Sequence, residues 1–189
     1  NTLNDIKGKK FSVGAPGSGV EANARQLLDV MGMTYNDFSA NYLSFSESAD
    51  SLKDKHIEGF MFVSGVPNAA IQDTATTSNL KFISISDDMI KKLIDKYPFF
   101  TEIVIPAGTY KGQSADVKTV AVKATLIVGS EVSEKVVYDL TKALFDNQKE
   151  LAEAHAKGAE LSLENAVKGV SVPFHPGAEK YYKEVGAIK

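Results

Sequence analysis

The chain has 189 residues, and 43% of them are hydrophobic, which is enough to bury the core of one medium domain or of two small lobes. Its 21 basic residues nearly balance its 24 acidic ones, a composition that argues against binding to nucleic acid. The sequence has no cysteine, which excludes disulfides, thiol nucleophiles and cysteine metal sites, and no apolar run approaches the roughly 18 residues of a membrane-spanning helix.

Apolar segments alternate with helical patterns over the first two thirds of the chain. Short apolar segments predict strands at Lys10–Gly14, Ala40–Phe45, Ile57–Val63 and Leu80–Ile85. Apolar residues at helical spacing predict helices at Val20–Met31, which Gly32 can end, at Ser46–Lys55, from about Pro67 onwards, and at Ser86–Pro98. Repeated strand–helix steps of this kind are typical of a largely parallel sheet covered by helices.

The last third of the chain has a different pattern. Thr101–Gln113 predicts a strand that runs into a loop, and Val117–Gly129 is a long run with high β propensity. Beyond Ser133 the pattern is helical to the end. One face of the first of these helices carries apolar residues at helical spacing: Val136, Val137, Leu140 and Leu144. Long helices after a long strand indicate a chain that leaves its first sheet and packs elsewhere.

The segment between the first predicted strand and the first predicted helix is rich in glycine. Gly14, Gly17 and Gly19 lie within six residues, together with a proline and Ser18. Glycine lets a ligand approach the backbone closely, and the free N–H groups of a first helical turn favour an anion. Ser18 can either cap the helix or bind that ligand.

The residues after the glycines bear on which anion would bind. A nucleotide-binding loop needs G-K-[ST] or G-x-G-x-x-G, and neither pattern fits this segment. Glu21 would also repel a polyphosphate, whereas a small carboxylate needs only two or three donors. The alternative is a tight strand-to-helix turn that binds nothing.

A similar turn follows the third predicted strand. There Ser64 and Gly65 precede a helix that starts near Pro67. If the first and third strands are neighbours, their carboxyl ends bring both turns to one edge of the sheet. Ligands bind at that edge in open α/β sheets.

Candidate catalytic groups are few. The three histidines, His56, His155 and His175, show no metal-ligand spacing and are expected to be surface or capping residues. The Asp87–Asp88 pair is typical of the first turn of a helix. We therefore expect no metal, no cofactor and no catalytic residue.

Five segments, spread in order over nearly the whole chain, carry a family resemblance: VGAPGSGVEANARQLL, YLSFSESADSLKD, IPAGTYKGQ, TVAVKATLIV and HPGAEKYYKEVG. They resemble the TAXI family, the extracytoplasmic solute-binding proteins of TRAP transporters. The resemblance implies a periplasmic-binding-protein type II-like α/β fold whose two lobes close on a ligand by hinge motion. It also implies a periplasmic protein that binds a small carboxylate or amino acid, such as glutamate or a related acid, and delivers it to TRAP membrane permease subunits.

The resemblance further implies how the chain divides. Residues 1–116 correspond to the second, ligand-closing α/β lobe, and residues 117–189 to a crossover strand and C-terminal helices that belong to the first lobe. Family members carry a further segment, forming most of the first lobe, before the position that corresponds to Asn1. We therefore expect the apolar faces of the C-terminal helices to need cover, and self-association is one way to supply it.

The resemblance assigns ligand contacts to the two turns and to the tyrosine of IPAGTYKGQ: Gly17, Ser18, Gly19, Ser64, Gly65 and Tyr110. An alternative function is that of a transferase or deaminase with a similar bilobed α/β architecture, whose glycine turn holds a phosphate or carboxylate substrate. Such an enzyme needs a placed acid, base or metal, and the sequence shows none of these.

Overall fold

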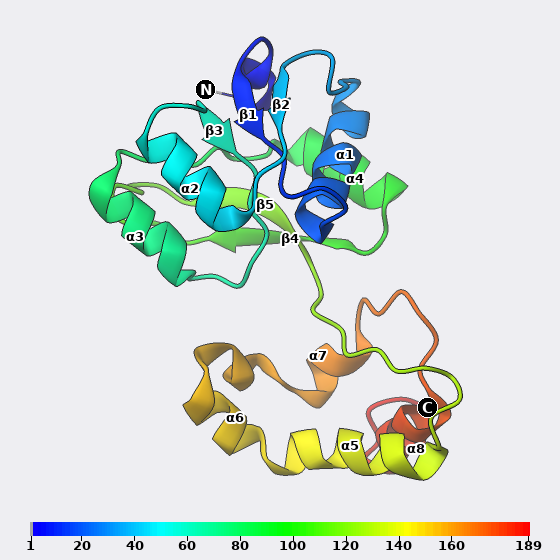
Figure 1. The fold of residues 1–189 in the computed structure, drawn as a ribbon. Helices are drawn as coiled ribbons and strands as arrows, with labels where there is room; N and C mark the ends of the chain where they lie inside the picture. Colours follow the sequence, from blue (N-terminus) through cyan, green and yellow to red (C-terminus); the bar gives the residue numbers. More distant parts are fainter. Residues whose placement is uncertain (1) are drawn as a thin grey trace. The chain divides into compact units, whose positions relative to one another are not determined.

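The computed structural model describes residues 2–189, which form two compact units (Figure 1). The first unit ends at Val122, and the second spans Lys123–Lys189. None of the helices in the described residues is both long enough and apolar enough to cross a membrane.

A parallel sheet forms the centre of the first unit (Figure 1). Its strands, in the order β2-β1-β3, are β2 (Ser39–Asn41), β1 (Lys10–Ser12) and β3 (Gly59–Phe60). Phe11 pairs with Ala40 on one side and with Gly59 on the other. The first and third strands are thus neighbours, which is the condition under which both turns come to one edge, although each strand is shorter than its apolar segment.

Each helix of the first unit begins beside a side chain that caps it. Ser18 caps α1 (Gly19–Met31), Ser44 caps α2 (Phe45–Lys53), Asn68 caps α3 (Ala69–Thr77) and Ser86 caps α4 (Asp87–Lys96). In every case the side-chain oxygen accepts a hydrogen bond from the N–H three residues further on. Gly32 ends α1 with a left-handed backbone, as predicted. The caps therefore fix where the chain turns from strand to helix.

The predicted fourth strand, Leu80–Ile85, is wrong. This segment has no ladder of paired residues in the part of the chain that the structure describes, and the Ile85 N–H donates to the Lys118 carbonyl oxygen. The remaining strands are antiparallel: β4 (Phe100–Ile105) pairs with β5 (Val117–Val122) along its whole length. The first unit therefore combines a three-stranded parallel sheet with a two-stranded antiparallel ribbon.

The predicted boundary after residue 116 also moves. The strand expected at Val117–Gly129 ends at Val122, and the whole of β5 is paired with β4 of the first unit. The break between the units accordingly falls between Val122 and Lys123. The rest of the predicted strand is exposed and has no regular structure.

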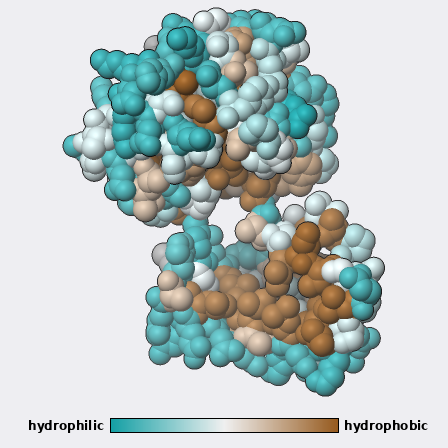
Figure 2. Space-filling model, viewed as in Figure 1, coloured by the Kyte–Doolittle hydropathy of each residue, from teal (hydrophilic) through white to brown (hydrophobic). Residues whose placement is uncertain are grey.

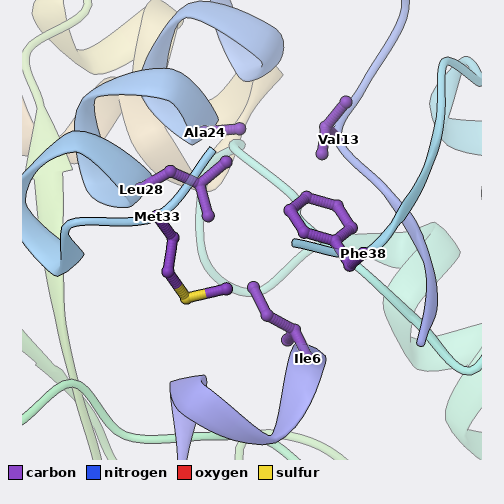
Figure 3. Packing of buried hydrophobic residues seen from close by; sticks show 6 residues of the cluster. All are labelled: Ile6, Val13, Ala24, Leu28, Met33 and Phe38. Carbon is purple, nitrogen blue, oxygen red and sulfur yellow. The ribbon is translucent and has the colours of Figure 1, made fainter. Parts of the chain in front are cut away.

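A cluster of buried apolar side chains lies between the sheet and α1 (Figure 3). It joins η1 (Leu3–Ile6), β1, α1 and the segment that leads to β2 through Ile6, Val13, Ala24, Leu28, Met33 and Phe38. A second cluster joins α3 to the segment after β4 through Ile71, Ala75 and Tyr110. The first cluster packs α1 against the sheet, and the second packs α3 against the segment that carries Tyr110.

The second unit is helical, as predicted beyond Ser133. Its elements are α5 (Glu134–Asp146), α6 (Gln148–Ala154), η2 (Ala156–Glu160), α7 (Leu163–Val167) and α8 (Pro176–Glu184). Gly177 lets α8 approach α5 closely, because a Cβ there would overlap the Glu134 carbonyl oxygen. The rings of Phe145 and Tyr181 stack across the same pair of helices, with centroids 5.6 Å apart.

Candidate ligand-binding site

Three helices begin at the same edge of the parallel sheet. Each of β1, β2 and β3 leads directly into the next helix along the chain, α1, α2 or α3. Because the strands are parallel, their carboxyl ends meet at one edge, and the amino ends of the three helices lie there too (Figure 1). The positive ends of the helix dipoles therefore point to this edge.

The glycine-rich turn after β1 is tight for a steric reason. Gly14 has φ of 97°, and a Cβ at this position would lie 2.7 Å from the Cβ of Val20. Gly17 also has a positive φ, of 70°, but it faces open space. Gly14 is therefore required by the packing of the turn, and Gly17 by its backbone conformation.

The N–H groups of this turn fall into two sets. The Ser18 N–H donates to the Ala15 carbonyl oxygen at 3.1 Å, while the Ser18 hydroxyl accepts from the Glu21 N–H at 3.2 Å. The Ser18 N–H is therefore not open to a ligand, and the Ser18 side chain caps α1, so that a ligand contact of Ser18 through its hydroxyl proton stays a prediction. Among the described residues, the N–H groups of Gly17 and Gly19 have no internal partner.

Gly19 has the most open position in the turn. It is the first residue of α1, and a Cβ built on it would meet no atom within 4 Å. Its N–H and that of Val20 have no internal acceptor among the described residues. The open donors of the turn are therefore the N–H groups of Gly17, Gly19 and Val20, so that Val20 takes the place of Ser18 in the predicted set of three.

Glu21 follows these donors and is buried in the first turn of α1. One carboxylate oxygen accepts from Arg25 at 2.7 Å, and the other accepts from the Tyr35 hydroxyl at 2.8 Å. Burial and the Glu21 carboxylate together raise the pKa of Tyr35 well above its ordinary value. The Arg25 guanidinium therefore offsets the negative charge of the Glu21 carboxylate beside the turn.

The turn after β3 is exposed at both predicted residues. The Ser64 hydroxyl donates to the Gly65 carbonyl oxygen at 2.9 Å. Further on, Asn68 caps α3 by accepting from the N–H groups of Ala70 and Ile71. Ser64 and Gly65 thus lie at the same edge of the sheet as the glycine-rich turn.

Tyr110 lies in the core and not on the open edge, contrary to the expectation of a ligand contact. Its ring is buried and stacks on Phe82, with centroids 5.1 Å apart. Its hydroxyl accepts a hydrogen bond of 3.0 Å from the Asn68 N–H. The side-chain oxygen of Gln113 accepts in turn from the Tyr110 N–H at 3.3 Å. Tyr110 therefore stabilises the start of α3 through the hydrogen bond that its hydroxyl accepts from the Asn68 N–H.

A buried polar contact between β1 and α2 was not predicted from the sequence. The hydroxyls of Ser12 on β1 and Ser48 on α2 lie 2.8 Å apart, and both side chains are buried. Ser48 follows the Ser44–Glu47 capping box, a signal that places α2 but does not reveal its partner. The contact ties the amino-terminal turn of α2 to the centre of the sheet.

The histidines have the capping and surface roles that were expected. His155 accepts from the Lys157 N–H at 3.1 Å, and His175 accepts from the Gly177 N–H at 3.2 Å. His56 is exposed after α2. Within residues 2–189, no group of three or more histidines and carboxylates lies close enough to hold a metal ion.

A family model described as NMT1-like matches residues 1–186. The chain belongs to the NMT1-like family. This family has a periplasmic-binding-protein-like fold, which agrees with the parallel sheet flanked by helices and confirms the expected fold class. Membership of the NMT1-like family indicates a solute-binding protein with a small-molecule ligand. The open donors at the carboxyl edge of the sheet are the part of this chain that suits such a ligand.

Proposed function

We propose that this chain is the solute-binding component of a TRAP transporter of the TAXI type. In this role it binds a small carboxylate, such as glutamate or a related acid, in the periplasm and delivers it to the membrane permease without chemical change. The five segments that resemble the TAXI family support the transporter type. The NMT1-like match supports the coarser function of solute binding.

The proposal of a carboxylate ligand rests on the N–H groups at the start of α1 that have no internal acceptor within residues 2–189. The N–H groups of Gly17, Gly19 and Val20 are free of internal partners among the described residues. A carboxylate has two oxygens and is satisfied by two or three donors, whereas a polyphosphate needs more donors and a cation. Since the Glu21 carboxylate is already bonded to Arg25 and Tyr35, it does not occupy these donors.

Calorimetric titration of the chain with a panel of amino acids and dicarboxylates tests the proposal. We expect at least one member to bind with a Kd in the micromolar range, equivalent to about −8 kcal/mol, and to remain chemically unchanged. Conversion of the ligand during the titration would favour the transferase or deaminase. Failure of the whole panel at millimolar concentration would contradict the carboxylate proposal.

A variant at Gly19 connects binding to the turn. In Gly19→Val a branched side chain fills the open space in front of the donors, so binding should fall at least tenfold. The midpoint of thermal unfolding should change little, because this position packs against nothing. Gly19→Ala is the matched control and should bind more tightly than Gly19→Val. Equal affinities for the two variants would show that the ligand does not approach Gly19.

A further inference from the structure

Positive charge is scarce in the segments that form the open edge of the sheet. Residues 11–52 and 59–80 cover the carboxyl ends of β1, β2 and β3, the turns after them and most of α1, α2 and α3. Figure 2 shows a largely hydrophilic surface over the first unit, which Figure 1 draws in blue to green. These two ranges nevertheless carry a single basic residue, Arg25, against six acidic ones. An anion bound by these segments therefore meets only one cationic side chain from them.

A contact with Glu21 holds the guanidinium of Arg25 near the amino end of α1. Arg25 lies one turn after Glu21, and its Nη2 donates to Oε2 of Glu21 at 2.7 Å. Helical side chains lean toward the amino end in this way. Glu21 directly follows Val20, whose N–H is one of the open donors. The charged group of Arg25 is therefore bonded to the residue that comes immediately after these donors.

The pairing with Glu21 leaves much of the guanidinium unused. The other carboxylate oxygen of Glu21 accepts from the Tyr35 hydroxyl at 2.8 Å, so that Arg25 holds Glu21 through one oxygen only. A guanidinium has five N–H donors along two edges, and each edge matches a carboxylate. Glu21 takes one of these donors within the described residues, so one edge keeps both of its donors.

The remaining edge of Arg25 is accessible to a solute. The Arg25 side chain is 63% exposed, whereas the Glu21 side chain is 6% exposed. Glu21 thus anchors the arginine from inside the protein while the arginine faces solvent. An anchored guanidinium loses less conformational freedom when it binds a second carboxylate than a free one does.

We propose that Arg25 determines the specificity of the site by binding a second carboxylate of the ligand, so that the site selects dicarboxylates over monocarboxylates. The inference rests on the proposed function, in which the open N–H groups at the start of α1 hold the first carboxylate. The second carboxylate accepts two parallel hydrogen bonds from the free edge of Arg25. An amide in its place carries no charge and has one oxygen, so it binds less tightly.

The alternative is that Arg25 only neutralises Glu21. Removal of Arg25 alone does not separate the two roles, because the uncompensated Glu21 carboxylate would itself repel a dicarboxylate more than a monocarboxylate. The double variant Glu21→Gln/Arg25→Gln removes both charges and leaves the net charge unchanged. If Arg25 only neutralises Glu21, this variant keeps the preference of the unaltered chain. If Arg25 binds the ligand, the preference is lost.

Calorimetric titration with matched pairs of compounds measures this preference. The pairs are glutamate and glutamine, aspartate and asparagine, and succinate and succinamate, which differ in one carboxylate. We expect the unaltered chain to bind the dicarboxylate of at least one pair more tightly, by on the order of tenfold or more. The ratio of the two dissociation constants should fall close to one in Glu21→Gln/Arg25→Gln. A general loss of affinity cancels in this ratio, and far-UV circular dichroism checks that the variant is folded.

Lys53→Gln is the matched control. It removes one positive charge from the last turn of α2, at the end of that helix away from the open edge, and should keep the ratio of the unaltered chain. Equal affinities within all three pairs would overturn the role of Arg25 and leave the carboxylate proposal standing. A preference that survives in the double variant, or that is lost in Lys53→Gln, would also overturn it. Failure of all six compounds to bind would overturn both proposals.

Nuclear magnetic resonance observes Arg25 directly, because it is the one arginine of the 189-residue chain. Its Nε–H therefore gives the single arginine side-chain signal in a proton–nitrogen correlation spectrum, and Arg25→Gln confirms the assignment by removing that signal. Saturation with the preferred dicarboxylate should shift the signal further than saturation with the matching amide does. An equal shift with both compounds, or no shift with either, would overturn the proposal.

Discussion

The hydroxyls of Ser12 and Ser48 form a buried hydrogen bond of 2.8 Å that joins the central strand of the parallel sheet to helix α2. Each hydroxyl is shielded from water, so each depends on the other for a partner. This contact holds the start of one helix against the strand that leads into another. It is a buried polar link between two of the elements that lead to the candidate site.

Removal of one of these hydroxyls should destabilise the first unit. Ser48→Ala leaves the Ser12 hydroxyl buried without a partner, at a cost of about 1–3 kcal/mol in the free energy of unfolding. Ser12→Ala should have a similar effect, and the double variant should cost less than the sum of the two. Urea denaturation of the four proteins measures the coupling. A strictly additive double variant would contradict a mutual hydrogen bond.

The two tight-turn glycines should differ in their tolerance of alanine. Gly17→Ala forces a left-handed backbone on alanine, which costs about 1–2 kcal/mol. Gly14→Ala adds to this a close contact with Val20, so its free energy of unfolding should fall further. Thermal and urea unfolding of both variants check the order. A Gly14 variant as stable as the Gly17 variant would show that the turn relaxes without cost.

Tyr110→Phe tests whether the Tyr110 hydroxyl stabilises the start of α3. The variant keeps the stack on Phe82 but removes the acceptor of the Asn68 N–H, and we expect a loss of about 1–3 kcal/mol in stability. Faster hydrogen exchange at the Asn68 amide should accompany this loss. Lys111→Ala, an exposed neighbour of Tyr110, serves as the control and should leave that amide unchanged. An unchanged exchange rate of the Asn68 amide in Tyr110→Phe would show that Tyr110 does not stabilise the start of α3.

Alkaline pH should weaken the contact between Tyr35 and Glu21. Because the pKa of Tyr35 is raised in the folded chain, its contribution to stability is fully present below about pH 10, the ordinary tyrosine value. That contribution is lost as the pH rises through the folded pKa. The difference in free energy of unfolding between the natural chain and Tyr35→Phe should therefore shrink above about pH 10. A difference that stays constant across this range would contradict the raised pKa.

Much of the first unit could be predicted because local signals decide its elements. Ser86 and Gly32 lie at helix ends where their side chain or backbone is needed, so their positions are readable without any partner. The parallel direction of the strands followed from the βα pattern, since parallel strands need a crossover connection, whereas their order was only a condition in the sequence. Local caps and connections therefore predict the edge of the sheet where the donors lie.

Contacts between distant segments could not be predicted in the same way. Leu80–Ile85 has the composition of a strand, but a strand requires a neighbour, and the segment shares few hydrogen bonds with β5. Tyr110 was expected at a ligand because its motif does not reveal that its hydroxyl meets the Asn68 N–H, 42 residues earlier. Burial of a polar group depends on such distant partners, which spacing along the chain does not encode.

The common direction of α1, α2 and α3 has a consequence for the speed of binding. Three positive helix ends at one edge produce a local electric field that attracts an anion before any hydrogen bond forms. The formal net charge of −3 repels the same anion from the rest of the surface, so that encounters are directed to this edge. Salt screens such fields over about 8–10 Å. Added salt should accordingly slow the capture of an anionic solute more than it hastens the solute's escape, a contrast that stopped-flow measurements can resolve.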